Sequence, residues 1–304
     1  MNEVYQILRE KEGLKKYDGE YKVVLSKEIK EKLEKEKNIF PNFAYKTKIP
    51  KLDKILGDGI EEGQLIVISG STGIGKSSFM TSLTFNFAEQ NIKALWLSYE
   101  LTYRQLFEKL DWTGLPLPDF YLPIKIRHQS MEWLRERIVE SVVKYDVKIV
   151  FIDHLHSLLP FNCIDPTKEV SNRVRLLKAL AIEFNIIIIC AVKVKRDLME
   201  IIPTEHDLRD SAMIGDEADT VIFIWRKLEK QTKEEKLNEG LKYRGNESVL
   251  YVAKCRKTGT RDFVPLIYEN NIFKELTYDT GEFEQSNEGG EKENEKIDTE
   301  RMSF

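Results

Sequence analysis

The chain has 304 residues, of which 41% are hydrophobic and 10% aromatic, so it holds enough apolar material for a packed core and is not disordered throughout. No segment approaches the roughly 18 uncharged apolar residues that span a membrane, and the charged start MNEVYQILREKEG lacks the apolar stretch of an export signal. The formal net charge of −4 argues only weakly against nucleic-acid binding, because the charge is unevenly distributed. Cys163, Cys190 and Cys255 have neither disulfide nor zinc spacing, which predicts a location in the reducing cytoplasm.

Residues 1–41 form a charged N-terminal segment. Leu25, Ile29 and Leu33 recur on it at helical spacing, which predicts a short amphipathic helix with a narrow apolar stripe. Such a helix is too lean to fold by itself. Two interpretations remain open: a solvated surface helix, or a linker helix that docks its stripe elsewhere, for instance on a neighbouring subunit.

Residues 42–281 alternate between strand and helix signals. Continuous apolar strands separated by amphipathic helices are what a parallel sheet covered on both faces requires. We therefore predict one doubly wound α/β domain with a mostly parallel sheet. The predicted strands are 65–69, 94–99, 148–153, 186–192, 220–225 and 249–255, and the predicted helices lie near 76–90, 102–111, 131–144 and 169–184.

The first of these strands runs into GSTGIGKS at 70–77, which matches the phosphate-binding pattern G-x-x-x-x-G-K-[ST] in full. Its glycines allow a tight loop whose backbone N–H groups point at phosphate oxygens, and the helix that follows presents its positive end to the same anion. Lys76 supplies a cation to the phosphates, and the hydroxyl of Ser77 is a ligand for Mg²⁺. The predicted nucleotide-binding residues are Gly70, Ser71, Thr72, Gly73, Ile74, Gly75, Lys76, Ser77 and Ser78.

Two acidic residues lie at the ends of other predicted strands. Asp153 ends strand 148–153, where a carboxylate that binds Mg²⁺ (a Walker-B acid) is expected. Glu100 follows the strand at 94–99, and an acid in that position faces the same crevice. We therefore predict that Glu100 activates the attacking water. The alternative for each acid is a structural role in a turn or helix cap.

Asp153, His154 and His156 together resemble a metal-ligand cluster in composition. However, Asp153 is already assigned to the nucleotide site, and the two histidines lack a third ligand at a helical spacing. We therefore expect loop histidines with ordinary hydrogen-bond partners rather than a dedicated transition-metal site.

The C-terminal segment 282–304 has eight acidic and three basic residues and almost no apolar side chains before its last three positions. Such a composition predicts a disordered tail, because it cannot offset the entropy lost on folding. The tail is either a solubilising segment or, through its acidic tip and terminal Phe304, a contact for a basic and apolar pocket on a partner.

Several segments resemble one family in their motifs. The resemblance covers about 45–275 and is to the C-terminal, RecA-like ATPase domain of the DnaB family of hexameric replicative helicases. The K-N-R-F-G element of the related RadA branch is not found here. The segments that carry the resemblance are SYELTYRQL (98–106, similar to S-L-E-M-x-x-x-Q-L), FIDHLHSL (151–158, to I-D-Y-L-Q-L), EVSNRVRLLKALA (169–181, to E-V-S-x-I-S-R-x-L-K-x-L-A), DLRDSAMIGDEAD (207–219, to D-L-R-D-S-G-x-I-E-Q-D-A-D) and VAKCRKTGT (252–260, to K-x-R-N-G-x-T-G).

The resemblance implies roles for individual residues. It implies that ATP and Mg²⁺ are bound by Lys76, Ser77 and Asp153, with Glu100 as the catalytic carboxylate. It also implies that Lys254 and Arg256 reach into the next subunit's γ-phosphate as a finger in trans, so that the active site exists only in an oligomer. The alternative for this pair is a solvated strand end.

Two features depart from the family pattern. Lys193 stands after strand 186–192, where the family usually has the glutamine that senses the γ-phosphate. A lysine can still contact phosphate, as a point charge without an amide's paired donor and acceptor. The family's globular N-terminal collar, which meets the primase, has no counterpart here, so we expect a motor domain standing nearly alone.

Basic residues near strand ends are candidates for single-stranded DNA contacts in the channel of such a ring, where binding would be sequence-independent and salt-sensitive. A solvated surface is the alternative for each of them. The candidates are Lys193, Lys195, Arg196 and Arg173.

The leading hypothesis is an ATP-dependent ring helicase that moves 5′→3′ on single-stranded DNA in the cytoplasm of a bacterial or phage-infected cell. Polymerase, primase or single-strand-binding protein are candidate partners through the acidic tail. A RecA- or RadA-like recombination ATPase and a non-motor, nucleotide-switched loader or adaptor are the alternatives.

Overall fold

The computed structural model describes residues 24–39, 44–127, 130–160, 162, 164–194, 212–226 and 245–277. The chain divides into two compact units, Met1–Phe43 and Ala44–Phe304. In the first unit, α2 (Ser26–Ile39) is the amphipathic helix predicted from the apolar spacing. Its stripe residues Leu25, Ile29 and Leu33 are all exposed within this unit.

The second unit is built on an eight-stranded sheet with the order β10-β9-β8-β7-β3-β6-β5-β4. Five strands run parallel to one another, and β8, β9 and β10 extend this sheet antiparallel. The parallel strands are β3 (Leu65–Gly70), β4 (Ala94–Ser98), β5 (Ile149–Asp153), β6 (Ile187–Lys193) and β7 (Thr220–Trp225); the others are β8 (Glu247–Cys255), β9 (Asp262–Glu269) and β10 (Ile272–Glu275).

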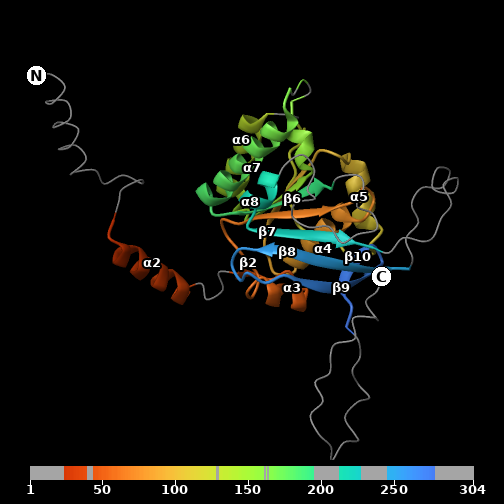
Figure 1. Ribbon diagram of the computed structural model, residues 1–304, viewed down its shortest axis with the longest axis horizontal. Helices are drawn as coiled ribbons and strands as arrows, with labels where there is room; N and C mark the ends of the chain where they lie inside the picture. The colour runs from red at the N-terminus through yellow and green to blue at the C-terminus, as the bar shows by residue number, and fades with distance from the viewer. Residues whose placement is uncertain are drawn as a thin grey trace, which may run out of the picture. The chain divides into compact units, whose positions relative to one another are not determined.

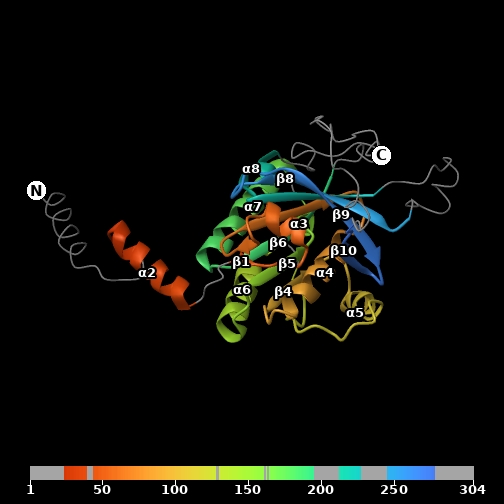
Figure 2. The same cartoon turned by 90° about the horizontal axis from the view of Figure 1, so that it is seen from below.

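Helices cover both faces of the sheet, which confirms the doubly wound prediction. Figure 1 shows α6, α7 and α8 on one side of the strands and α3 on the other, and Figure 2 shows α4 beside β10 and β4. The helices are α3 (Pro50–Ile55), α4 (Lys76–Ala88), α5 (Tyr103–Asp111), α6 (Met131–Tyr145), α7 (Pro166–Glu183) and α8 (Ala212–Glu217), together with the 3₁₀ turn η1 (Leu155–Leu158) and a small ribbon of β1 (Ala44–Tyr45) and β2 (Ile60–Glu61).

The alternation of side-chain direction along the buried strands explains the two apolar layers. Ile66 and Ile68 of β3 pack with α3, α4 and α5, whereas Leu65 and Val67 face α6, α7 and α8. Because successive side chains of a strand point to opposite faces, a strand that is apolar throughout suits a sheet covered on both sides. Among the described helices, none is long and apolar enough to cross a bilayer.

The helix starts follow local capping chemistry. Thr102 caps α5 in a reciprocal capping box with Gln105, and Ser130 and Asp165 accept hydrogen bonds from the first turns of α6 and α7. The helix α4 differs, because Gly75 at its N-cap offers no side-chain acceptor. Its first N–H groups are therefore left for an external anion.

Candidate active site

The loop between β3 and α4 has a backbone that only glycine can adopt at two positions. A Cβ atom on Gly70 would lie 2.8 Å from the carbonyl oxygen of Ile224, and one on Gly75 would lie 2.9 Å from Cζ of Phe273; both residues have positive φ angles. Gly73 also has a positive φ, with nothing within 4 Å of its Cβ direction. The loop is thus tightly packed underneath and open above, as a phosphate cradle requires.

Lys76 lies inside the curve of this loop. Its Nζ donates hydrogen bonds to the carbonyl oxygens of Gly70 and Ser71, both at 2.8 Å. Burial lowers the pKa of Lys76 to about 8, although the charges of Asp153 and Glu100 act in the opposite direction. The ammonium is therefore already in position, but the nearby negative charges do not fully offset its burial. An added anion would stabilise its charged form.

Asp153 ends β5 directly beside the loop. The Ser77 hydroxyl donates a hydrogen bond to Oδ2 of Asp153 at 2.6 Å. Burial raises the pKa of Asp153, while the hydrogen bond from Ser77 lowers it. A hydroxyl and a buried carboxylate in contact are oxygen donors of the kind that Mg²⁺ prefers, so these residues fit a magnesium ion.

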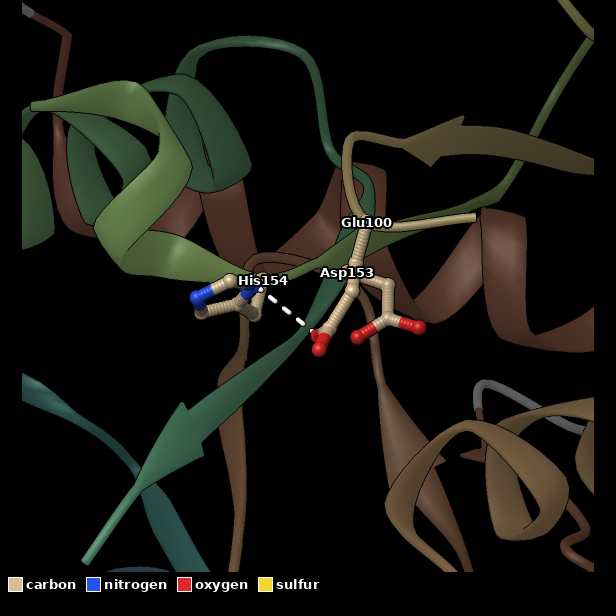
Figure 3. Close-up of side chains that lie close together, drawn as sticks. All are labelled: Glu100, Asp153 and His154. Atoms are coloured by element: carbon tan, nitrogen blue, oxygen red, sulfur yellow. Dashed lines mark ion pairs between the residues drawn. The ribbon is translucent and has the colours of Figure 1, made fainter. Parts of the chain in front are cut away.

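Glu100 follows β4, the neighbour of β5 in the sheet. The backbone N–H groups of Tyr99 and Glu100 both donate to the carbonyl oxygen of Asp153, at 2.8 and 3.2 Å. The carboxylate of Glu100 has Nδ1 of His154 3.1 Å from Oε2 and Nζ of Lys193 3.8 Å from Oε1. Figure 3 shows Glu100 and Asp153 reaching the same space from adjacent strand ends, with the His154 ring beside them. One potential ligand atom from each of these three residues lies within 4.8 Å of the others.

Lys193 lies at the same end of the sheet. It is the last residue of β6 and pairs in register with Gly70, the last residue of β3. Its positive charge contributes to the lowered pKa of Lys76. The structure thus brings Lys76, Asp153, Glu100 and Lys193 together at the carboxyl ends of four adjacent parallel strands.

Lys254 and Arg256 lie at the opposite end of the sheet. Cys255 between them pairs with Thr220 at the start of β7, and Thr220 pairs with Ile66 near the start of β3. Nζ of Lys254 donates to the carbonyl oxygens of Gly215 and Asp216 in α8, at 2.6 and 3.0 Å. The pair is therefore remote from the phosphate loop of its own chain.

Comparison with known proteins now identifies the family. The family model for the DnaB-like helicase C-terminal domain matches residues 44–112 and 121–275, more than half of the chain. The chain belongs to this family.

Relatives named as DnaB and RadA match parts of the chain. The replicative DNA helicase DnaB of Mycoplasma genitalium is 31% identical over 228 residues, covering 63% of this chain and 48% of the relative. The DNA repair protein RadA of Campylobacter jejuni is 32% identical over only 114 residues, covering 38% and 24%. A solved structure of an isolated ATPase domain has a TM-score of 0.68 at 18% identity and covers 84% of this chain and 99% of that chain, which supports the RecA-like fold. This chain spans about half the length, or less, of the curated relatives it matches.

The predicted DNA-contacting residues of this DnaB-like domain are only partly within the described chain. Arg173 in α7 is mostly buried, with its Nη2 2.6 Å from Oε1 of Glu169. Lys195 and Arg196 lie outside the described residues, as does the acidic tail 282–304. Among the four candidates, the structure therefore places Lys193 at the nucleotide end and Arg173 in an intrachain ion pair.

Three features of this DnaB-like domain were not predicted from the sequence. His154 contacts the Glu100 carboxylate, and Asp219 is a buried acid under Arg256. A small cavity of about 40 Å³ also adjoins α4, and Lys109 beside it donates from Nζ to the Ser78 hydroxyl at 3.3 Å. The adjacency of Asp153 and His154 was a signal for the first. The cavity depends on Tyr268 in β9, a strand not predicted, and on Asn271 in the turn after it. Its lining is Ser78, Thr81, Lys109, Trp112, Tyr268 and Asn271.

Proposed function

We propose that this chain is the ATP-hydrolysing motor of a ring-forming replicative helicase that moves 5′→3′ on single-stranded DNA and unwinds the duplex ahead of it. Family membership and the relatives named as replicative helicases support this function. The observation that carries it is the division of charged groups between the two ends of the sheet. A phosphate loop with two carboxylates lies at one end and a Lys–Arg pair lies at the other.

At the phosphate end, the open loop and the uncapped start of α4 bind the phosphates of ATP through backbone N–H groups. Lys76 exchanges its two carbonyl acceptors for phosphate oxygens. Ser77 and Asp153 would hold Mg²⁺, which neutralises charge on the phosphates when bound.

Glu100 orients the attacking water and accepts its proton. Phosphoryl transfer depends mostly on positioning and charge stabilisation, so a carboxylate next to the phosphate loop suits this role. Lys193, at the register position of Gly70, contacts the γ-phosphate as a sensor in place of the family's glutamine.

Lys254 and Arg256 complete a neighbouring subunit's site. Their distance from the phosphate loop of the same chain supports action in trans, and their intrachain contacts with α8 and Asp219 define where they are held. A finger supplied in trans couples hydrolysis to movement between subunits. This proposal implies an oligomer, with a hexameric ring as the expected form.

DNA and partner contacts extend the same proposal. Lys195, Arg196 and Arg173 remain the DNA candidates, and the acidic tail remains a candidate contact for polymerase, primase or single-strand-binding protein. One solved neighbour is described as a DnaB-like replicative helicase and its interactions with primase, at 20% identity and a TM-score of 0.64. A cytoplasmic location is proposed with the function.

The deciding experiment measures ATP hydrolysis with and without single-stranded DNA, together with unwinding of forked duplexes that carry either a 5′ or a 3′ tail. DNA-stimulated hydrolysis with unwinding only from the 5′ tail is the expected result. Unwinding from the 3′ tail would contradict the direction, and binding of ATP without hydrolysis or unwinding would favour a nucleotide-switched adaptor. Filaments instead of rings in electron micrographs would favour the RadA-like alternative.

A further inference from the structure

Packing does not restrain the side chain of Glu100. Its backbone is fixed by the hydrogen bonds to the Asp153 carbonyl, but the side chain is 41% exposed, between β4 and α5. An exposed glutamate has several accessible rotamers, and holding it in one of them costs conformational entropy. A carboxylate that orients a water therefore needs a partner that fixes its oxygens.

His154 is the better-fixed of its two partners. Its side chain is only 11% exposed, and its Nδ1 lies 3.1 Å from Oε2 of Glu100. The next turn holds the residue from below, because the backbone N–H of Ser157 donates to the His154 carbonyl oxygen at 3.1 Å. A carboxylate only accepts hydrogen bonds, so a hydrogen bond across this contact requires a hydrogen on Nδ1, which both the neutral and the charged imidazole can supply.

Lys193 approaches the other oxygen more loosely. Its Nζ lies 3.8 Å from Oε1, an ion-pair distance beyond normal hydrogen-bond length. The same ammonium lies at the register position of Gly70, at the edge of the phosphate loop. Lys193 can therefore exchange Glu100 for a phosphate, whereas the second group near Nδ1 of His154 is the neutral hydroxyl of Ser157, at 3.4 Å.

The two contacts coincide with two departures from the motif pattern. The segment similar to I-D-Y-L-Q-L has His154 in the tyrosine position, and Lys193 stands in the glutamine position. His154 directly follows β5 and Lys193 ends β6, and the two side chains lie next to the two oxygens of one carboxylate.

We propose that His154 is a positioning residue that holds Glu100 in its water-orienting conformation, while Lys193 forms the second, exchangeable contact of the same clamp. The proposal rests on the proposed role of Glu100. When Lys193 moves to the γ-phosphate, the contact with His154 keeps the carboxylate in place.

The test compares His154→Ala and His154→Asn in steady-state ATP hydrolysis and in binding of a fluorescent ATP analogue. Loss of the imidazole should lower kcat about tenfold and leave KM and analogue affinity unchanged, because only the orientation of the carboxylate is lost. Asparagine places an N–H near the position of Nδ1, so His154→Asn should restore most of kcat. His156→Asn, on the same turn, controls for damage to the turn, and thermal melting of each variant reports folding.

Glu100→Gln separates failure of the clamp from failure of the proposed function. If Glu100→Gln hydrolyses ATP at the wild-type rate, the role of Glu100 is wrong and the clamp with it. If Glu100→Gln is inactive, the clamp predicts that adding His154→Ala lowers its residual rate no further. A wild-type kcat in His154→Ala would overturn the clamp alone, as would an equal loss in the alanine and asparagine variants.

Discussion

The two ends of the sheet differ in how completely one chain builds them. At the phosphate end, four parallel strands bring Lys76, Glu100, Asp153 and Lys193 close enough for their charges to interact. At the opposite end, Arg256 donates to the Asp219 carboxylate at 2.9 Å and to the Asp216 carbonyl oxygen at 2.8 Å, with half of its side chain exposed. The first end gathers the phosphate loop and two carboxylates, and the second end holds an arginine on a buried acid.

This difference follows from strand direction. The strand β8 runs antiparallel to β7, so the residues at its carboxyl end lie beside the amino end of β7, at the edge of the sheet away from the phosphate loop. No side-chain movement within one chain spans the length of a strand. The two halves are therefore expected to meet across a subunit boundary, and the proposed reaction depends on both.

Lys76→Ala should have the largest effect, because it removes the cation from the phosphate end. Hydrolysis should fall by more than about a thousandfold, and nucleotide binding should weaken with it, since the loop loses its main charge. Calorimetric titration with ATP and a phosphate-release assay measure the two effects. Lys48→Ala, in an exposed ion pair with Glu89, is the matched control and should leave both unchanged.

Arg256→Ala should lower hydrolysis by about a thousandfold while ATP binding stays intact, because a trans arginine stabilises the transition state rather than the ground state. Lower nucleotide affinity in this variant, or full hydrolysis, would contradict the assignment. The same phosphate-release and binding assays apply.

Mixing subunits sharpens this prediction. In a mixed oligomer, an Arg256→Ala subunit can supply Lys76 while its neighbour, a Lys76→Ala subunit, supplies Arg256. The boundary between them then contains one complete site. The mixture should therefore hydrolyse ATP faster than either variant alone. If both residues acted within one chain, mixing would restore nothing.

Most of the phosphate end could be predicted from the sequence, and most of the opposite end could not. The pattern at 70–77 and the acids after two apolar strands are local signals, and parallel strands bring their carboxyl ends to one edge. The predicted strands and helices agree with β3 to β8 and α4 to α7 to within a few residues. The assignment of catalytic roles to these residues remains a prediction.

The remaining features depend on pairing between distant segments. The strands β9 and β10 were not predicted, because β9 is only partly buried and contains Pro265, while β10 is short. Asp219 gives no local signal of its role, since its partners Leu65, Lys178 and Arg256 come from three other elements. The Glu100–His154 contact likewise depends on the pairing of β4 with β5.

Asp219→Asn should destabilise the opposite end. The carboxylate is 9% exposed and accepts from Lys178 at 2.6 Å and from the Leu65 N–H at 2.8 Å. Asparagine can keep the second contact but leaves the Lys178 ammonium without its charge partner, so we expect the free energy of unfolding to fall by about 3 kcal/mol. Urea unfolding measures this change. Glu183→Gln, which breaks the exposed pair with Arg135, is the control and should lower the free energy of unfolding by less than about 1 kcal/mol. An equal loss of stability in both variants would contradict the special role of the buried Asp219.

The smallest expected effect is a pH dependence confined to the phosphate end. The pKa of Lys76 is lowered from its ordinary value of 10.5 to about 8, so the ammonium loses its proton as the pH rises through 8. Bound phosphate would favour the charged form, so binding takes up a proton above this pH. ATP affinity should therefore fall by at most about tenfold per pH unit above 8.

Lys76→Arg distinguishes this cause from any general effect of pH, because a guanidinium stays charged throughout the range. Its affinity should be flat where that of the wild type falls, and a parallel decline in both proteins would contradict the assignment. The same lowered pKa means that the unfolded chain binds more protons between pH 8 and 10.5, so this group's contribution to the free energy of unfolding should rise with pH in that interval. ATP binding that weakens above pH 8, while the contribution of Lys76 to the free energy of unfolding rises, would show that the loss of binding is not caused by unfolding. Arg256 at the opposite end stays charged at these pH values, so its contribution to hydrolysis should not change.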